Sequence, residues 1–129
     1  MIYYLDTSFA LQAVFPTPDR DRLISWFDDK QFISSRLLRT EVIRALRREA
    51  RPLTDADWVF DRIGLIDITR ATHNQAEAIE RHTKTLDALH LATALSLDFP
   101  VTIATADTAM RDLANALGFT TISLTEAIT

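Results

Sequence analysis

The chain has 129 residues, a length that fits one domain and is sufficient to bury a hydrophobic core. It contains no cysteine, which excludes disulfide bonds, thiol nucleophiles and thiolate zinc sites. The net charge of −4 argues against a protein that coats nucleic acid non-specifically. No apolar run approaches the ~20 residues that span a bilayer. Residues 1–5 are too short for a signal peptide. We therefore expect a cytoplasmic protein with no membrane partner.

Short apolar strand patterns alternate with helical patterns along the chain. In chain order, the residues predict a strand at 2–5, helices at 7–15 and 19–30, a strand at 31–34, helices at 37–50 and 54–64, a strand at 65–68, helices at 71–81 and 86–97, a strand at 100–105, a helix at 109–117 and a strand at 119–124. Gly64 and Gly118 are expected to end the helices that precede them. Strands separated by helices imply one α/β domain over residues 1–129 with a parallel sheet.

Four acidic residues stand where a strand or an apolar run meets a helix: Asp6, Glu41, Asp87 and Asp107. Asp6 and Asp107 directly follow apolar strands, so we expect both at the carboxyl edge of the sheet, where open α/β sheets bind ligands. Asp87 stands near the start of an almost wholly apolar helix, and Glu41 lies about one turn into its own helix. Carboxylates gathered at this edge would repel one another and favour a divalent cation.

Each acid also has a purely structural interpretation. Asp6 and Asp107 could cap helices, each with a stabilisation of about 1 kcal/mol. Glu41 could be a surface residue that pairs with Arg44. Asp87 could stabilise the start of its helix through the helix dipole. None of the four is decisive alone, but their occurrence together in one chain favours a functional site.

The negative net charge hides a basic segment at residues 36–51, where six arginines stand against two glutamates, a local excess of four positive charges. The planar guanidinium group suits phosphate. We interpret four of these side chains as candidate phosphate contacts: Arg36, Arg39, Arg44 and Arg47. The alternative is a solvated helix face with arginine–glutamate pairs.

Four sequence motifs surround the acids: YLDTS at residues 4–8, TEV at 40–42, LDALHLATA at 86–94 and TAD at 105–107. In order and spacing they resemble the acidic motifs of PIN-domain ribonucleases and, within that family, VapC-type toxins of bacterial toxin–antitoxin pairs. The stretch DALHLATA is the most specific of them. The resemblance extends over essentially the whole chain.

The resemblance implies a three-layer α/β/α fold with a central, mainly parallel sheet of about five strands. It implies a Mg²⁺- or Mn²⁺-dependent endoribonuclease that leaves 5′-phosphate and 3′-hydroxyl ends. Asp6, Glu41, Asp87 and Asp107 would be its catalytic and metal-binding carboxylates. The arginines would then contact the RNA backbone. The implied partners are an RNA substrate, a cognate antitoxin and a second copy of the chain in a homodimer.

The same resemblance suggests supporting residues. Thr7 or Ser8 matches the hydroxyl residue that follows the first aspartate, and Thr105 is the threonine of a T-x-D pattern. Asp112 could supply a further acid or could lie on the surface. We interpret His90 as a packing residue that hydrogen-bonds Asp87, three residues before it, and not as a general base.

Other functions fit the sequence less well. A phosphatase with an aspartate nucleophile requires a second aspartate where Ser8 stands. A phospho-acceptor receiver domain requires a lysine after a late strand, and neither Lys30 nor Lys84 is so placed. The remaining alternative is a catalytically silent PIN-like module that binds RNA or protein, which metal-dependent cleavage would distinguish from the enzyme.

Overall fold

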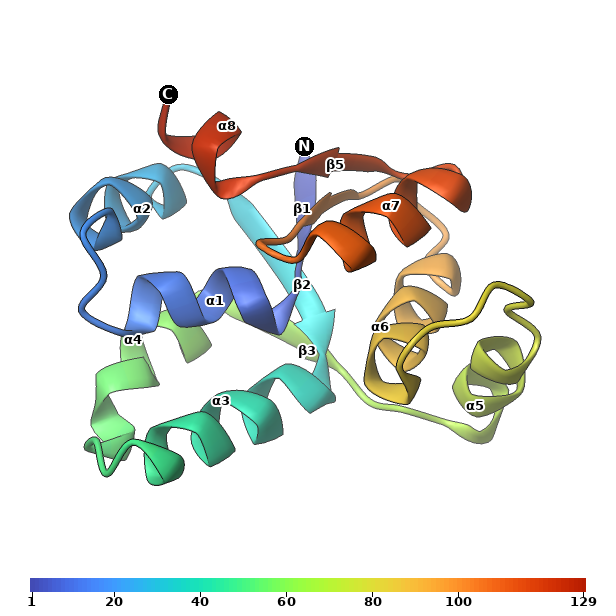
Figure 1. Cartoon of the computed structure of the whole chain (residues 1–129), viewed down its shortest axis with the longest axis horizontal. Coiled ribbons are helices and arrows are strands. Elements are labelled where there is room, and N and C mark those ends of the chain that lie inside the picture. Colours follow the sequence, from blue (N-terminus) through green and yellow to red (C-terminus); the bar gives the residue numbers. More distant parts are fainter.

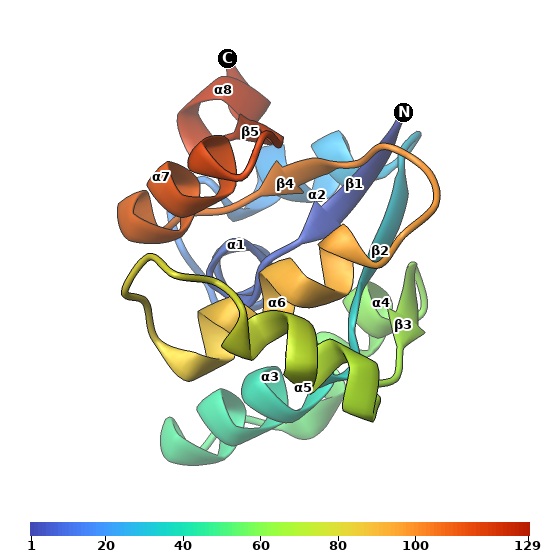
Figure 2. The ribbon, with the colours of Figure 1, turned by 90° about the vertical axis from the view of Figure 1, so that its right-hand side faces the viewer.

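The computed structural model describes residues 1–129 as three layers, with a sheet between two layers of helices (Figures 1 and 2). The sheet has five strands in the order β3-β2-β1-β4-β5, and every neighbouring pair is parallel. Its strands are β1 Ile2–Leu5, β2 Gln31–Ser35, β3 Ile63–Ile66, β4 Thr102–Ala104 and β5 Thr120–Ile122. The predicted α/β/α fold with a parallel sheet of about five strands is confirmed.

Eight α-helices and one 3₁₀ helix connect and follow the strands. They are α1 Thr7–Val14, α2 Arg20–Phe27, α3 Arg36–Arg48, the 3₁₀ helix η1 Leu53–Ala56, α4 Asp57–Phe60, α5 Arg70–Glu77, α6 Thr85–Leu95, α7 Thr108–Ala116 and α8 Leu124–Ile128. None of them combines the length and the apolarity that a membrane span requires.

Each face of the sheet has its own hydrophobic core, and strand β1 contributes to both. Leu5 belongs to the core formed with α1, α2, α3 and α4, whereas Tyr4 belongs to the core formed with α6 and α7. This division follows from the period of two along a strand, which turns neighbouring side chains to opposite faces. The helices between β1 and β3 therefore cover one face, and those between β3 and β5 cover the other.

The strand order creates a switch point between β1 and β4. The chain leaves β1 for α1 on one face and leaves β4 for α7 on the other face. At this edge the ladder continues into Asp6, whose backbone N–H donates to the carbonyl of Ala104 at 2.9 Å. Ligands of open α/β sheets bind at such points, outside the carboxyl ends of the strands.

Helix α3 brings the third predicted acid toward this edge. It begins after Ser35, whose hydroxyl accepts a hydrogen bond from the backbone N–H of Leu37 at 3.1 Å. Its buried residues recur at helical spacing and turn one face to the core: Leu38, Val42, Ala45 and Leu46. Glu41 precedes Val42 and therefore lies at the border between the core face and the exposed arginines.

Several predicted element bounds were wrong: the strand predicted at 65–68 lies at Ile63–Ile66, the helix predicted at 71–81 ends at Glu77, and larger differences occur at 54–64 and at the carboxyl terminus. The predicted helix at 54–64 is instead η1 followed by the short α4, and Gly64 lies inside β3, where it pairs with Ile33. The buried Ile63 begins the strand before the glycine, so this glycine ends no helix. Gly118 does follow α7, with a φ of 95° that suits glycine. Helix α8 was not predicted, although Ser123 and Glu126 form a capping box at its start.

Candidate active site

The four predicted acids come from the starts of helices at the carboxyl edge of the sheet. Asp6 directly precedes α1, Glu41 lies in α3, Asp87 is in the first turn of α6 and Asp107 directly precedes α7. Burial raises the pKa of Asp87, and the negative charges of Asp6 and Asp107 raise it further. Three of the acids are therefore close enough to repel one another. Glu41 bonds Thr7, the residue that follows Asp6, and His90, three residues after Asp87.

Asp6 is 5% exposed and is held by two hydroxyl groups from different elements. Its Oδ2 accepts from Ser8 Oγ at 2.6 Å and from Thr105 Oγ1 at 2.8 Å. Its side chain makes no capping bond to α1, so the capping interpretation of this residue is wrong. Asp6 Oδ1 accepts no protein hydrogen bond and is not among the buried atoms without a partner, so it retains access to solvent.

The directions of these hydroxyl bonds are fixed by the loop that follows β4. Ser8 Oγ accepts from the backbone N–H of Ala106 at 3.0 Å, and Thr105 Oγ1 accepts from that of Asp107 at 3.1 Å. A hydroxyl has a single proton to donate. A carboxylate oxygen only accepts, so both hydroxyl protons go to Asp6 at 2.6 and 2.8 Å in preference to the longer 3.3 Å contact between Ser8 Oγ and Thr105 Oγ1. The loop and the carboxylate thus fix each other in place.

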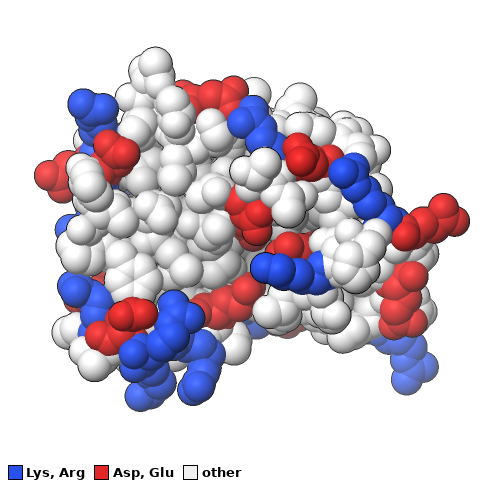
Figure 3. Space-filling model, in the orientation of Figure 1, with Lys and Arg blue, Asp and Glu red and all other residues white.

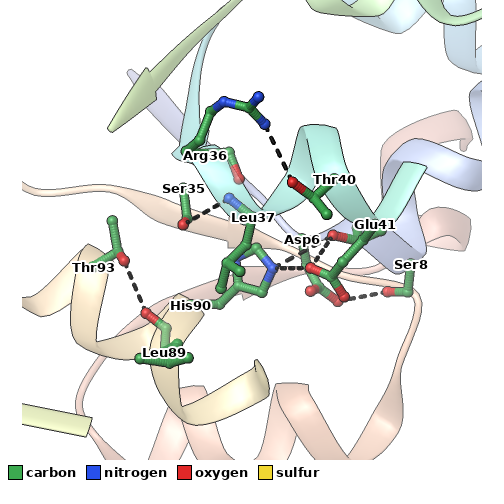
Figure 4. Close-up of polar contacts among 12 residues, drawn as sticks. Asp6, Ser8, Ser35, Arg36, Leu37, Thr40, Glu41, Leu89, His90 and Thr93 are labelled. Carbon is green, nitrogen blue, oxygen red and sulfur yellow. Dashed lines mark hydrogen bonds and ion pairs between the residues drawn. The ribbon is translucent and has the colours of Figure 1, made fainter. Parts of the chain in front are cut away.

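Glu41 is clamped in a similar way. Its Oε1 accepts from Thr7 Oγ1 at 2.9 Å and lies 2.7 Å from His90 Nε2 (Figure 4). Glu41 therefore does not form the surface pair with Arg44 that helical spacing allowed. The expectation that His90 bonds Asp87 was also wrong, because α6 packs against β2 and turns the ring toward α3. Thr7 and Ser8 both support the site, one for each acid.

Asp107 has a structural role as well as a position in the site. Its Oδ1 accepts from the backbone N–H groups of Ala109 at 2.8 Å and Met110 at 3.4 Å, so it caps α7 as the alternative interpretation proposed. Its second oxygen makes no hydrogen bond to the protein. Asp112, one turn into α7, is exposed and makes no hydrogen bond to the acids or to their partners.

The oxygen atoms left free by these bonds suit a hard divalent cation. Asp6, Glu41 and Asp107 each keep one carboxylate oxygen without a protein partner, and Asp87 keeps two. Carboxylate oxygen is the ligand that Mg²⁺ and Mn²⁺ prefer. No three acidic or histidine side chains are grouped so that they could hold one ion as they stand. Mg²⁺ commonly takes one or two carboxylates and keeps its waters, so the donor set fits such an ion.

A basic pocket lies beside the acids, between α1 and α3. It has a volume of about 420 Å³ and is lined by Thr7, Leu11, Glu41, Arg44, Ala45 and Arg48. Figure 3 shows lysine and arginine side chains gathered over α3, below the acidic side chains of the same face. Of the predicted phosphate contacts, only Arg44 lines this pocket.

The other three predicted arginines have different surroundings. Arg36 donates to Thr40 Oγ1 at 3.3 Å, and Arg39 lies over the Phe60 ring at 4.7 Å from its centroid. Arg47 is exposed, as is Arg48, which forms an ion pair with Glu49. The sequence analysis missed Arg48 as a pocket residue, although it lies four residues after Arg44, the spacing that places two side chains on one helix face.

The sequence analysis also missed Tyr4, whose phenol oxygen lies 2.9 Å from His90 Nδ1 behind the acids. The available signal was its place in β1. A tyrosine two residues before Asp6, in a strand that is buried on both faces, must find a hydrogen-bond partner for its hydroxyl group.

Comparisons with known proteins agree with this architecture. Among solved structures, the chain is similar to VapBC2 from Rickettsia felis bound to a DNA fragment from their promoter, with a TM-score of 0.70, 16% identity and coverage of 95% of this chain and 98% of that one. It is also similar to VapC20 from Mycobacterium tuberculosis, a sarcin-ricin loop cleaving toxin, with a TM-score of 0.69, 18% identity and coverage of 92% and 96%.

A toxin–antitoxin complex from Klebsiella pneumoniae matches with a TM-score of 0.65 and 18% identity, over 84% of this chain and 89% of that one. At these identities the likeness shows the fold. No curated protein sequence matches the chain. The sequence model of the PIN domain, however, matches residues 3–116, which include all four acids. The chain therefore belongs to the PIN domain family.

Proposed function

We propose that this protein is a Mg²⁺- or Mn²⁺-dependent endoribonuclease that acts as the toxin of a type II toxin–antitoxin system. The observation that carries the proposal is the grouping of Asp87 with Asp6 and Asp107: burial raises the pKa of Asp87, and the negative charges of the other two acids raise it further. Acids that repel one another at a ligand-binding edge favour a divalent cation. The similar structures support the toxin role, since one is an RNA-loop cleaving toxin and another is a toxin–antitoxin complex.

The four carboxylates would hold the cation through the oxygens that have no protein hydrogen bond. When bound, the cation supplies activation of water and neutralisation of charge on the phosphate. Asp6 is held by Ser8 and Thr105, so its orientation is set before any substrate binds. Hydrolysis of this kind requires no side-chain nucleophile and leaves 5′-phosphate and 3′-hydroxyl ends.

The arginines of α3 would provide contacts to the RNA backbone. Arg44 pairs with no carboxylate and shares its pocket with Glu41, so its guanidinium group is available beside the acids. We assign Arg44 to the phosphate next to the cleaved bond. Arg36 and Arg39, which precede it on α3, and Arg47, which follows it, would contact other phosphates of the backbone. Contacts to phosphate supply affinity and register and do not read the base sequence.

The toxin role requires further partners. A cognate antitoxin would inhibit the enzyme, and we propose that two copies of the chain form a homodimer. The cytoplasm is the proposed location, because the RNA substrate and the antitoxin are made there.

Cleavage of total RNA by the purified protein tests the proposal. Wild type, Asp6→Asn and the control Asp98→Asn are each incubated with Mg²⁺ or Mn²⁺ and, separately, with EDTA. Asp98 is exposed and lies between α6 and β4, so its substitution removes the same charge away from the acids. We expect discrete metal-dependent fragments from the wild type and the control, and none from folded Asp6→Asn.

Sequencing the fragment ends would then identify the RNA target and the cleaved bond. Binding of Mn²⁺ without cleavage of any RNA would favour the catalytically silent binding module. If the protein neither cleaves RNA nor binds a divalent cation, the four-carboxylate site is wrong.

A further inference from the structure

A buried chain of hydrogen bonds runs behind the acids from β1 through α6 to α3. Tyr4 and His90 are each 1% exposed. The phenol oxygen of Tyr4 accepts from the backbone N–H of Ser35 at 3.1 Å and lies 2.9 Å from His90 Nδ1. On the other side of the ring, His90 Nε2 lies 2.7 Å from Glu41 Oε1, and Figure 4 shows the ring pointing at this carboxylate.

The donors around Tyr4 assign the protons along this chain. A carboxylate oxygen only accepts, so the 2.7 Å contact with Glu41 requires a proton on His90 Nε2. The phenol oxygen already accepts from Ser35, and its own proton is directed at His90 Nδ1. An imidazole that accepts at Nδ1 carries its proton at Nε2 and donates from there. His90 therefore donates to Glu41 Oε1.

Two donors thus meet a single oxygen of Glu41. Thr7 Oγ1 is the second, at 2.9 Å, and the side chain of Glu41 is 25% exposed. An unrestrained glutamate at this position on α3 could turn toward Arg44, one turn further along the helix. With Oε1 held by Thr7 and His90, the other oxygen of the partly exposed carboxylate has no protein partner.

We propose that Tyr4 and His90 are positioning residues that fix the carboxylate of Glu41 for cation binding. This inference rests on the proposed function. Donors behind a metal ligand orient it, and their removal typically costs about 10- to 100-fold in metal affinity or activity. Core packing alone does not explain why Tyr4 and His90 form this series of hydrogen bonds, because buried polar groups carry a desolvation cost that apolar residues of similar shape avoid.

The two nitrogen atoms of His90 permit a matched test. In His90→Gln the amide nitrogen can take the place of Nε2 and still donate to Glu41, whereas the shorter side chain of His90→Asn cannot. Tyr4→Phe removes only the phenol oxygen. Its control is Tyr3→Phe, because the neighbouring hydroxyl of Tyr3 makes no hydrogen bond to the protein and the ring packs against Trp26 and Phe32.

Mn²⁺ affinity of the purified chain is measured by electron paramagnetic resonance titration, beside thermal unfolding and the kcat and KM for RNA cleavage. We expect Tyr4→Phe and His90→Asn to bind Mn²⁺ about tenfold more weakly and to lose kcat at unchanged KM. His90→Gln should stay closer to the wild type than His90→Asn, and Tyr3→Phe should match the wild type.

A variant Glu41→Gln separates failure of this inference from failure of the proposed function. Wild-type Mn²⁺ affinity in folded Tyr4→Phe and His90→Asn, together with loss in Glu41→Gln, would overturn the positioning role and leave the nuclease intact. A wild type that binds no Mn²⁺ would overturn both. Nitrogen NMR of the wild type gives a second test, since it must find the His90 proton on Nε2, and a neutral ring protonated at Nδ1 would overturn the inference.

Discussion

The two halves of the acidic site are held by different means. Asp6 and Glu41 each present one oxygen to two side-chain donors, which come from elements far apart in the sequence. The side chain of Asp107 is bonded only by the backbone of its own helix, and the side chain of Asp87 makes no hydrogen bond to the protein. The first half is thus oriented by tertiary structure before any ligand arrives. The second half is placed by helix starts, and the charges of Asp6 and Asp107 still raise the pKa of Asp87 beyond the effect of burial.

This difference predicts where substitutions harm activity and where they harm or improve stability. In the first half, loss of a side-chain donor should weaken cation binding through misorientation. In the second half, loss of a charge should relieve repulsion in the cation-free protein. A site of this kind combines a rigid side, which sets geometry, with a charged side, which makes the cation necessary.

Among the residues that hold the acids in place, the largest expected effect comes from the two hydroxyl groups that bond Asp6. We expect Ser8→Ala and Thr105→Val each to lower metal-dependent cleavage about tenfold, because Asp6 loses one of its two donors. Thr102→Val is the control, since Thr102 is buried in β4, three residues before Thr105, and its hydroxyl lies 2.9 Å from that of Thr120, away from the acids. If Thr105→Val and Thr102→Val lost cleavage equally, the loss would reflect destabilisation of β4 and its flanking loop and not the bond to Asp6.

The sequence was sufficient to predict where Asp6 and Asp107 lie in the fold, because their positions follow from local patterns. Asp6 directly follows β1 and Asp107 lies three residues after β4, and parallel strands align their carboxyl ends. The partners of those acids could not be predicted in the same way. The ring of His90 reaches Glu41 only because α6 packs against β2 beside the start of α3, a contact between residues 49 positions apart. Helical spacing alone favoured a bond from His90 to Asp87 and an ion pair of Glu41 with Arg44.

The features of the fold can be separated in the same way, since some follow from local sequence patterns and others depend on packing. The alternation of strands and helices predicted the parallel sheet, and the structure confirmed it. The prediction of one helix at 54–64 was wrong, because the buried Ile63 pairs with Phe32 at the sheet edge and so begins β3 before Gly64. In the sequence Gly64 indicated the end of a helix, yet the burial and pairing of the strand determined its conformation. The capping box of α8 was a local signal that the sequence analysis overlooked.

Arg44 tests whether the basic pocket belongs to the first half of the site. We expect Arg44→Gln to raise KM for RNA several-fold, to leave Mn²⁺ affinity unchanged and to lower the salt dependence of binding by about one phosphate contact. Arg22→Gln is a matched control, because Arg22 is exposed on α2, outside the basic segment. A fall in kcat at unchanged KM would instead place Arg44 in the chemistry of cleavage.

Asp107 allows its capping role to be separated from its charge. Asparagine caps helices about as well as aspartate, so Asp107→Asn should lose cleavage and keep its stability. Asp107→Ala should lose both, with about 1 kcal/mol taken from the free energy of unfolding, because α7 loses its side-chain cap. Urea denaturation of the two variants at one pH measures the difference. Equal stabilities would show that the bonds to Ala109 and Met110 contribute nothing net.

The smallest expected effect concerns the charge of Asp87. Its pKa is raised in the folded protein by burial and by Asp6 and Asp107, so the folded state binds this proton more tightly than the unfolded state does. Stability should therefore fall as the pH rises from the ordinary value of 3.8 through the raised pKa, and the loss should persist at neutral pH. Asp87→Asn should accordingly unfold at a higher temperature than the wild type at pH 7 without metal. The advantage should shrink on acidification and when Mn²⁺ is added to the wild type, because either a proton or a cation relieves the same repulsion. A variant less stable than the wild type at pH 7 would mean that Asp87 interacts favourably with the start of α6 more strongly than it is repelled by the other acids.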